Sequence, residues 1–380
     1  MTTTTERTKG AHHTRRPRQP LARTMRSLSI DTVGDHSSAL SPVGSGSLHS
    51  SATSLVEGLR MAQDFTHQPV LLEEVTELFA SVPAGVIVDA TLGGAGHAAA
   101  LLTARSDLAI LGIDRDPIAR AAAAQRLAAF EERVAIVDGS FASIARIVDS
   151  GTTGEGSWPG TANGRPVVGI LADLGVSSPQ LDHAGRGFSF SQDGPLDMRM
   201  DTTRGVTAAA YLDAVDLDVL TALLRENGEG KYARRIAKAI LAARPVTTTA
   251  QLVGIVDRAV PKGDRRRGHV AARVFQGLRI AVNDEMGELE ELLAAAVSLV
   301  APGGVIAVIS YHSGEDARVK HTMRSWSDGT CTCPPGLPCV CDSVQLGTMV
   351  TRRAITATDH EVMVNPRARS ARLRAFEVSA

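Results

Sequence analysis

Apolar and polar positions alternate in blocks along the chain from residue 85 onward. Short apolar runs occur in "GVIVDAT", "LAILGID", "VAIVDGS" and "VVGILADLG", and helix-like sequences such as "AGHAAALLTAR" and "DPIARAAAAQRLAAFEE" separate the first three. Short runs of this kind that alternate with helices are typical of βαβ units. The pattern therefore predicts an α/β domain with a parallel sheet and right-handed crossovers.

The alternation stops for roughly a hundred residues after the fourth apolar run. Sequences with helical periodicity, such as "VDLDVLTALLREN" and "KYARRIAKAILAAR", follow one another there without a strand between them. A helix in "NDEMGELEELLAAAVSLV" and a fifth strand in "VIAVISYH" then resume the pattern. We therefore predict one α/β domain that carries a mostly helical insertion.

The first sixty residues differ in composition from the rest. They are rich in Thr, Ser, Arg and His and lack a sustained apolar period, which predicts a disordered arm at 1–60. An acid-poor, Arg-rich segment also fits a transit peptide or a start codon placed too early, since Met61 opens the ordered-looking sequence. Residues 151–166 have the Gly-, Thr- and Pro-rich composition of a surface linker.

Composition, net charge and cysteine content narrow the class of protein. Hydrophobic residues make up 43% of the 380 residues, and the net charge is −1, so a nucleic-acid surface must come from local clusters of Lys and Arg. No apolar run is long enough to span a membrane. All four cysteines lie in "CTCPPGLPCVC" (331–341), which does not resemble a secreted disulfide framework and indicates a reducing cytoplasm. They could hold a structural zinc, remain thiols or form a reversible disulfide, and the chemistry inferred below needs no metal.

Two motifs indicate a nucleotide-type pocket. "DATLGGAGHA" joins the first strand to the first helix, and Gly93, Gly94 and Gly96 allow a tight turn and a close approach to a ligand. Asp114, which ends the second strand, can accept both hydroxyl hydrogens of a ribose. The alternative is a plain turn with Asp114 as a helix N-cap. S-adenosylmethionine fits this pocket, and Phe141 could pack against its adenine or belong to the core.

Asp173 ends the fourth apolar run, in "DLGVSSPQ". Ligands of open α/β sheets bind beyond the carboxyl ends of the strands, so Asp173 should border the same pocket. A carboxylate there can hold the N–H groups of an exocyclic amine and aim its lone pair at a methyl donor. The small residues after it leave room for a planar base, and Gln180 could bond to either ligand. The alternative for Asp173 is a turn-forming residue.

Several long strings resemble those of the RsmH (MraW) family. They include "HQPVLLEEV", "DATLGGAGH", "DLGVSSPQLD", "DGPLDMRMD", "FQGLRIAVNDE" and "NPRARSARLR", and the resemblance runs from about His67 to Phe376. It implies a Rossmann-like class I S-adenosylmethionine methyltransferase sheet with an inserted mostly helical domain. The implied boundaries are 61–181 and 271–380 for the methyltransferase domain and 182–270 for the insertion, which would recognise the substrate.

The implied activity is methylation of N4 of the cytidine at position 1402 of bacterial 16S rRNA. Asp173 is the implied catalytic residue, and S-adenosylmethionine is the implied cofactor. Its contacts would be Ala95, Gly96, His97, Asp114, Phe141, Asp173 and Gln180. The chain departs from the family pattern at Val270, where proline is usual, and at Tyr311, where phenylalanine is common.

The expected partner is 16S rRNA or the small ribosomal subunit, and a homodimer is left open. Phe188, Phe190 and Tyr311 are candidates for holding a cytidine that has left its stack, or are core residues. Three basic clusters are expected to contact phosphates, unless they are solvated helix faces. They are Lys231, Arg234, Arg235 and Lys238, then Arg265 to Arg267, then Arg367, Arg369, Arg372 and Arg374.

Two other functions compete with this interpretation. A DNA amino-methyltransferase would usually carry a "D/N-P-P-Y/F" string at the fourth strand, and "DLGVSS" lacks both the prolines and the aromatic residue. An RNA-binding assembly factor could keep the pocket as a remnant of the fold. The intact glycine turn with Asp114 and Asp173 favours an enzyme.

Overall fold

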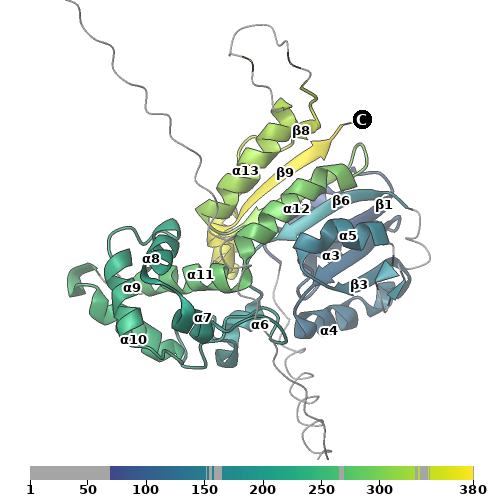
Figure 1. Ribbon diagram of the computed structural model, residues 1–380. Coiled ribbons are helices and arrows are strands. Elements are labelled where there is room, and N and C mark those ends of the chain that lie inside the picture. The colour runs from purple at the N-terminus through teal and green to yellow at the C-terminus, as the bar shows by residue number, and fades with distance from the viewer. Residues whose placement is uncertain are drawn as a thin grey trace, which may run out of the picture. The chain divides into compact units, whose positions relative to one another are not determined.

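Seven strands form one sheet in the computed structural model, which describes residues 69–150, 152–153, 156–157, 165–264, 269–329, 333, 341 and 343–379 (Figure 1). Their order is β3-β2-β1-β6-β7-β9-β8. Strands β3 to β7 in this order run parallel, and β9 is antiparallel to both β7 and β8. The strands are β1 Gly85–Asp89, β2 Leu108–Asp114, β3 Val134–Asp138, β6 Val167–Asp173, β7 Val305–Ser310, β8 Gly347–Met349 and β9 Arg372–Val378.

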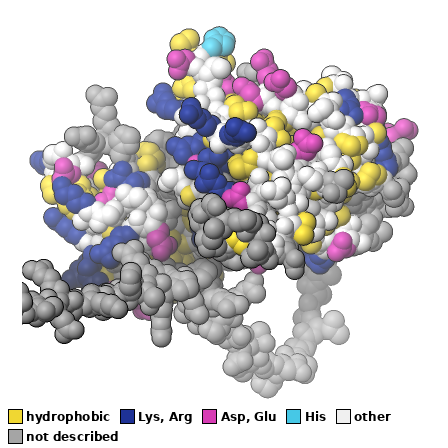
Figure 2. Space-filling model, turned by 90° about the horizontal axis from the view of Figure 1, so that it is seen from above, with side chains coloured by type: hydrophobic (Ala, Val, Ile, Leu, Met, Phe, Trp, Pro, Cys, Tyr) yellow, Lys and Arg dark blue, Asp and Glu magenta, His cyan; other side chains and the backbone are white. Residues whose placement is uncertain are grey.

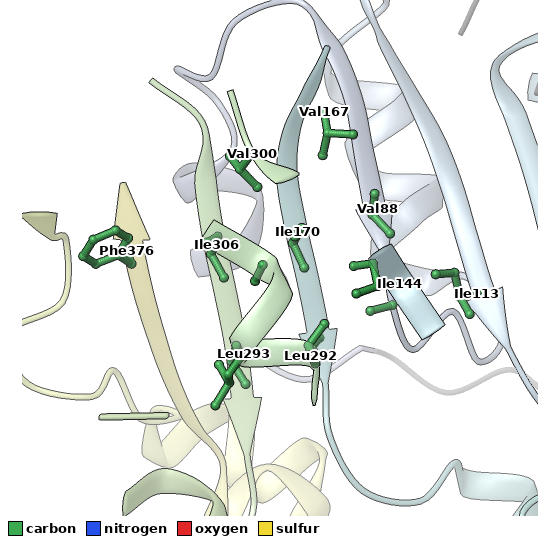
Figure 3. Close-up of a cluster of buried hydrophobic side chains, with 14 of the residues drawn as sticks. Val88, Ile113, Ile144, Val167, Ile170, Leu292, Leu293, Val300, Ile306 and Phe376 are labelled. Atoms are coloured by element: carbon green, nitrogen blue, oxygen red, sulfur yellow. The ribbon is translucent and has the colours of Figure 1, made fainter. Parts of the chain in front are cut away.

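The central strands are apolar because both faces of the sheet are buried. Val86 and Val88 of β1 face one hydrophobic cluster, and Ile87 between them faces another. The first cluster packs the sheet against α5 (Ile144–Ser150), α12 (Glu285–Leu299) and α13 (Ser313–Asp328), and Figure 3 shows its side chains interleaved. The second packs it against α2 (Leu72–Leu78), α3 (Gly96–Ala104) and α4 (Pro117–Arg126). This is the three-layer arrangement that buried parallel sheets adopt.

Local sequence explains where these helices begin. The side chain of Asp116 accepts the backbone N–H of Ile118 at the start of α4, and Pro117 occupies the first helical position. α13 begins with a reciprocal capping interaction between His312 and Glu315. The shorter elements near the sheet are α14 Asp359–Val364, the 3-10 helices Phe141–Ser143 and Pro366–Ser370, and the hairpin strands β4 Thr152–Thr153 and β5 Gly156–Ser157.

Helices between β6 and β7 form a second hydrophobic core. They are α6 Ser178–Asp182, α7 Ala208–Ala214, α8 Leu217–Glu226, α9 Ala233–Ala242, α10 Thr249–Ala259 and α11 His269–Asn283. The buried members of this core run from Phe188 to Leu278 and include none of the sheet's residues. α11 contributes Val274, Phe275 and Leu278 to it, while Asn283 at the end of α11 holds the backbone of Met200. The exact boundaries of the insertion remain a prediction.

The structure differs from the sequence prediction in two elements. One helix was expected through "DPIARAAAAQRLAAFEE", but α4 ends at Arg126 and a 3-10 helix with a kink at Phe130 follows. Strands β8 and β9 were not predicted, and Arg372 and Arg374 of β9 were expected to contact phosphates. Arg374 can lie in a strand at 6% exposure because Asp316 binds its guanidinium through two hydrogen bonds, at 2.6 and 3.2 Å.

All described residues belong to one compact unit that spans Val43–Ala380, and the other unit, Met1–Pro42, contains no described residue. The predicted N-terminal arm and most of the linker at 151–166 lie outside the described residues. Within the part of the chain that the structure describes, no helix has both the length and the apolar character needed to cross a bilayer.

Candidate active site

Four parallel strands end in aspartate at the same edge of the sheet. Asp89, Asp114, Asp138 and Asp173 terminate β1, β2, β3 and β6. The strand order reverses between β1 and β6, which is where open α/β sheets form their ligand crevice. A cavity of about 360 Å³ opens there, a volume within the usual range for small-molecule sites.

The cavity brings together most of the predicted site residues. Its lining includes Gly96, His97, Asp114, Phe141, Asp173 and Gln180. Ala95 does not line it, because this fully buried residue forms the N-cap of α3 with a left-handed φ of 58°. Ala95 therefore shapes the turn from behind, and a contact from its side chain to a ligand is not expected.

Asp114 ties the glycine turn to the end of β2. Its Oδ2 accepts the backbone N–H of Gly93 at 2.8 Å, and its Oδ1 accepts that of Asp116 at 2.8 Å. The N-cap alternative is wrong, because Asp116 caps α4. Burial raises the pKa of Asp114 to about 6 against these two hydrogen bonds. The carboxylate is thus fixed in place and retains lone pairs for a ligand's hydroxyl groups.

Asp173 is held from two sides. Its backbone N–H donates to Thr91 Oγ1 at 2.6 Å, and its Oδ1 accepts the hydroxyl of Tyr311 at 2.7 Å. Burial raises the pKa of Asp173, while nearby His97 and the Tyr311 hydrogen bond oppose the rise. Burial and Asp173 together raise the pKa of Tyr311 well above 10, so the phenol stays a donor. The other oxygen of Asp173 has no hydrogen bond within the described residues.

The other predicted contacts have partners of their own. His97 Nε2 lies 2.9 Å from the carbonyl oxygen of Val70, so that nitrogen is the donor. The amide of Gln180 accepts the N–H of Ser177 at 3.0 Å and donates to Asp116 at 3.1 Å. The hydroxyl oxygen of Ser177, which lines the cavity, is buried without a partner among the described residues.

Asp89 is a buried carboxylate that the sequence interpretation missed. It is 2% exposed, and burial raises its pKa to about 7, with further rises from Asp173 and Asp114. Its position at a strand end, like those of Asp114 and Asp173, is the signal that could have found it. Unlike them it does not line the cavity.

Replacing Asp89 with asparagine is expected to stabilise the protein at alkaline pH. The folded protein binds a proton at Asp89 that the unfolded chain, with an ordinary pKa near 3.8, has lost, so wild-type stability falls as pH rises from about 4 to about 7. Asparagine removes this penalty. Thermal melting should show an increase of several degrees at pH 8 and little change at pH 4.5. An equal effect at both values would contradict a buried proton on Asp89.

The cavity lining also contains charged residues that the sequence interpretation did not place. Arg279 of α11 and Glu285 of α12 form a bidentate ion pair with two 2.7 Å hydrogen bonds. Glu315 and Asn365 line the cavity as well. No spacing rule marks such residues, because Glu285 follows Arg279 only after the left-handed turn at Asp284.

The aromatic candidates are separated by the fold. Phe188 is 6% exposed within the insertion core, and Phe190 is 43% exposed with its ring 5.9 Å from that of Phe275. Only Tyr311 of the three lines the cavity. Phe141 lines it as well, with the guanidinium of Arg115 5.9 Å from its ring centroid.

The residues of the predicted basic clusters have different surroundings in the structure. Figure 2 shows Lys and Arg side chains gathered in groups on one face of the molecule. Lys231 and Arg234 are each paired, at 2.8 Å, with Asp264 and Asp218. Arg374, which was expected to contact phosphate, is instead buried against Asp316. Arg265 to Arg267 lie outside the described residues.

The cysteine motif lies only partly within the described residues. Cys331 and Cys339 are outside them, and a zinc site built from all four thiols stays a prediction. No cluster of three or more His, Cys, Asp or Glu side chains suited to a metal occurs among the residues that the structure describes.

The fold and the cavity together define the class of protein. A Rossmann-like sheet with an antiparallel strand beyond its fifth parallel strand, a glycine turn after β1 and an acid after β2 are the features of class I S-adenosylmethionine-dependent methyltransferases. The chain belongs to the MraW methylase family, whose model matches residues 64–379.

Curated relatives cover nearly the same length. Ribosomal RNA small subunit methyltransferase H of Myxococcus xanthus is 48% identical over 321 residues, covering 83% of this chain and 98% of that protein. The proteins of the same name from Geobacter sulfurreducens and Symbiobacterium thermophilum are 48% and 46% identical, each over 82% of this chain and over 99% and 96% of their own lengths. The N-methyltransferase NodS from Bradyrhizobium japonicum, solved with S-adenosyl-L-homocysteine, gives a TM-score of 0.34 at 10% identity, over 86% of this chain and 98% of that one. That overlap is too low to inform the site.

Proposed function

We propose that this protein transfers a methyl group from S-adenosylmethionine to N4 of a cytidine in small-subunit rRNA, at position 1402 of 16S rRNA. The observation that carries the proposal is that Asp173 and Asp114 border one cavity beside the glycine turn. The names of the relatives support the substrate class. The reaction would take place in the cytoplasm, where rRNA is modified.

The lining of the cavity fits the proposed cofactor. Gly93 and Gly96 leave the backbone open to a close approach, and Asp114 offers lone pairs to ribose hydroxyls. Phe141 offers an apolar ring for adenine. When bound, S-adenosylmethionine supplies an electrophilic methyl group on its sulfonium sulfur.

Asp173 would orient the acceptor nitrogen. The lone pair of an aromatic amine is delocalised into its ring, so the amine is a weak nucleophile. One oxygen of Asp173 is occupied by Tyr311, which leaves the other to accept an N4–H and favour a pyramidal nitrogen. The nitrogen sheds a proton once it is methylated, so Asp173 acts through orientation and electrostatics.

The proposal is tested by methyl transfer to isolated substrates. The protein is incubated with methyl-labelled cofactor and with small subunits from cells that lack the modification, and the rRNA is then mapped by mass. The expected result is one methyl group on N4 of the cytidine at position 1402. Label in DNA would favour an amino-methyltransferase of DNA, and tight binding to subunits without transfer would favour an assembly factor. Light scattering on the same preparation decides whether a homodimer forms.

The insertion offers a surface for the RNA backbone. Arg235 and Arg258 flank a groove between α9 and α10, of about 340 Å³, whose floor is made of alanines and Ile255. Unlike Lys231 and Arg234, these two arginines have no acidic partner among the described residues. An unneutralised cation releases more counterions when it binds phosphate than one already paired with a carboxylate. We infer that Arg235 and Arg258 contact phosphates.

Replacing Arg235 and Arg258 together with glutamine is expected to weaken binding to the small subunit. The slope of log affinity against log salt should fall by about 2, since two phosphate contacts are lost. The matched control replaces Lys231 and Arg234 with glutamine, and its slope should change by less than about 0.5 because both residues are already paired. Filter binding across a salt series measures both. Equal losses in the two double variants would contradict this assignment.

A further inference from the structure

Arg279 is a largely buried cation that the proposed reaction has not used. Its side chain is 16% exposed, and Glu285, which holds it, is 8% exposed. Both line the cavity that contains Asp173. Nε and Nη2 of Arg279 are occupied by the two oxygens of Glu285. A guanidinium gripped along one edge in this way cannot rotate freely.

The remaining nitrogen, Nη1, is available to a ligand. Nη1 forms no hydrogen bond within the described part of the chain. Part of its surface is nevertheless accessible. It is therefore open to the cavity that Arg279 lines. Nη1 carries two N–H groups and no acceptor, so a ligand beside it must present an acceptor.

Arg279 and Asp173 line the same cavity and share a charged neighbour, Glu315. Glu315 acts electrostatically on both residues, and Glu315 also accepts the backbone N–H of Tyr311 at 2.8 Å, whose hydroxyl binds Asp173. Phe141, the proposed adenine neighbour, is instead contacted by Arg115. The cavity thus presents an acceptor, Asp173, and a fixed donor, Arg279, to a ligand that enters it.

We propose that Arg279 determines specificity for cytosine by donating from Nη1 to ring nitrogen N3 of the target base, while Asp173 accepts the adjacent N4–H. This assignment rests on the proposed function and names how its base is read. Cytosine carries a donor at N4 next to an acceptor at N3, which complements the pair. Uracil carries an acceptor at O4 next to a donor at N3, so both contacts would be repulsive. Adenine repeats the pattern of cytosine and would be excluded by its size.

The test compares two substrates and two proteins. Small subunits are reconstituted with either cytidine or 3-deazacytidine at the nucleotide that the wild-type protein methylates, since the second base has C–H in place of N3 and retains the amine. Single-turnover rates are measured for wild type and Arg279→Lys. We expect wild type to lose about a hundredfold on 3-deazacytidine, because a polar site that loses its partner discriminates strongly. The rate of Arg279→Lys on cytidine should fall by about the same factor. Its rate on 3-deazacytidine should be less than about threefold lower than its rate on cytidine.

The comparison separates recognition from a structural role. 3-Deazacytidine differs from cytidine in nucleophilicity, but this difference affects both proteins equally and cancels when their rate losses are compared. The wild-type measurement does not depend on the folding of any variant. Arg115→Lys is the matched control, because Arg115 also lines the cavity and pairs with a glutamate, Glu288. The rate loss caused by Arg115→Lys should multiply with the rate loss caused by 3-deazacytidine. The cofactor affinity of Arg279→Lys should stay within about threefold of wild type.

Two results would overturn the inference. One is a wild-type rate that does not depend on N3. The other is a loss for Arg279→Lys that multiplies with the loss for 3-deazacytidine, as for Arg115→Lys. If wild type does not methylate cytidine at all, it is the proposed function that fails, so the two failures are distinguishable.

Discussion

Replacing Asp173 with alanine is expected to lower the rate of methyl transfer about a thousandfold. The carboxylate is the acceptor for the N4–H in the proposed reaction, and removing one preorganised polar group from a closed site typically costs two to three orders of magnitude. Cofactor affinity should change by less than about tenfold, since Asp114 and the glycine turn remain in place. Single-turnover kinetics with labelled cofactor and unmodified small subunits measure the rate, and calorimetry measures the affinity.

Asp138→Ala is the matched control for this variant. Asp138 also ends a strand of the sheet but pairs with Arg120 outside the cavity, so its removal should leave the rate within about twofold. Tyr311→Phe gives a finer test. Without the hydroxyl the pKa of Asp173 should rise further, so the acid limb of the rate profile should move to higher pH. A wild-type rate for Asp173→Ala would remove Asp173 from the chemistry.

Replacing Asp114 with alanine is expected to weaken cofactor binding by about two-hundredfold or more. The ribose of the cofactor would lose its hydrogen bonds to the carboxylate, and each such bond to a charged partner is worth roughly 1.5–3 kcal/mol. The N–H groups of Gly93 and Asp116 would lose their acceptor as well. Since the pKa of Asp114 is about 6, wild-type affinity should fall as pH drops through that value, and the variant should lose this part of the pH dependence.

The control for this variant is Asp107→Ala. Asp107 precedes β2, is 44% exposed, and pairs with Arg105 away from the cavity. Its loss should not alter cofactor affinity, and thermal melting of both variants shows whether the fold persists. An Asp114→Ala protein that binds the cofactor as tightly as wild type would disprove the ribose assignment.

The sequence predicted the sheet well wherever burial alone determines the pattern. The five parallel strands are apolar on both faces, so their runs stand out, and the rule that ligands bind beyond strand ends located Asp114 and Asp173. The turn "DATLGGAGHA" could be interpreted because glycines are needed where backbone and ligand approach closely. Such features depend on residues close together in the chain.

Features that depend on distant pairing could not be predicted. β9 contains two arginines, and only the position of Asp316 on α13 makes one of them a buried residue. The ion pairs of Lys231 and Arg234 could not be predicted for the same reason, since Asp264 and Asp218 lie on other elements. Arg279 reaches the cavity because of how α11 meets α12, which no local pattern records.

Helix α11 belongs at one end to the core of the insertion and at the other to the wall that carries Arg279. The position of α11 along its own axis is therefore set by the packing around Val274 and Phe275 as well as by the sheet. Because a displacement of about 1 Å can cost a hundredfold in rate, a cavity-forming change deep in the insertion would slow turnover without touching RNA or cofactor. Slow turnover in such a variant is thus no proof of contact with substrate, and mutational maps of this enzyme need a structural or binding readout beside every rate.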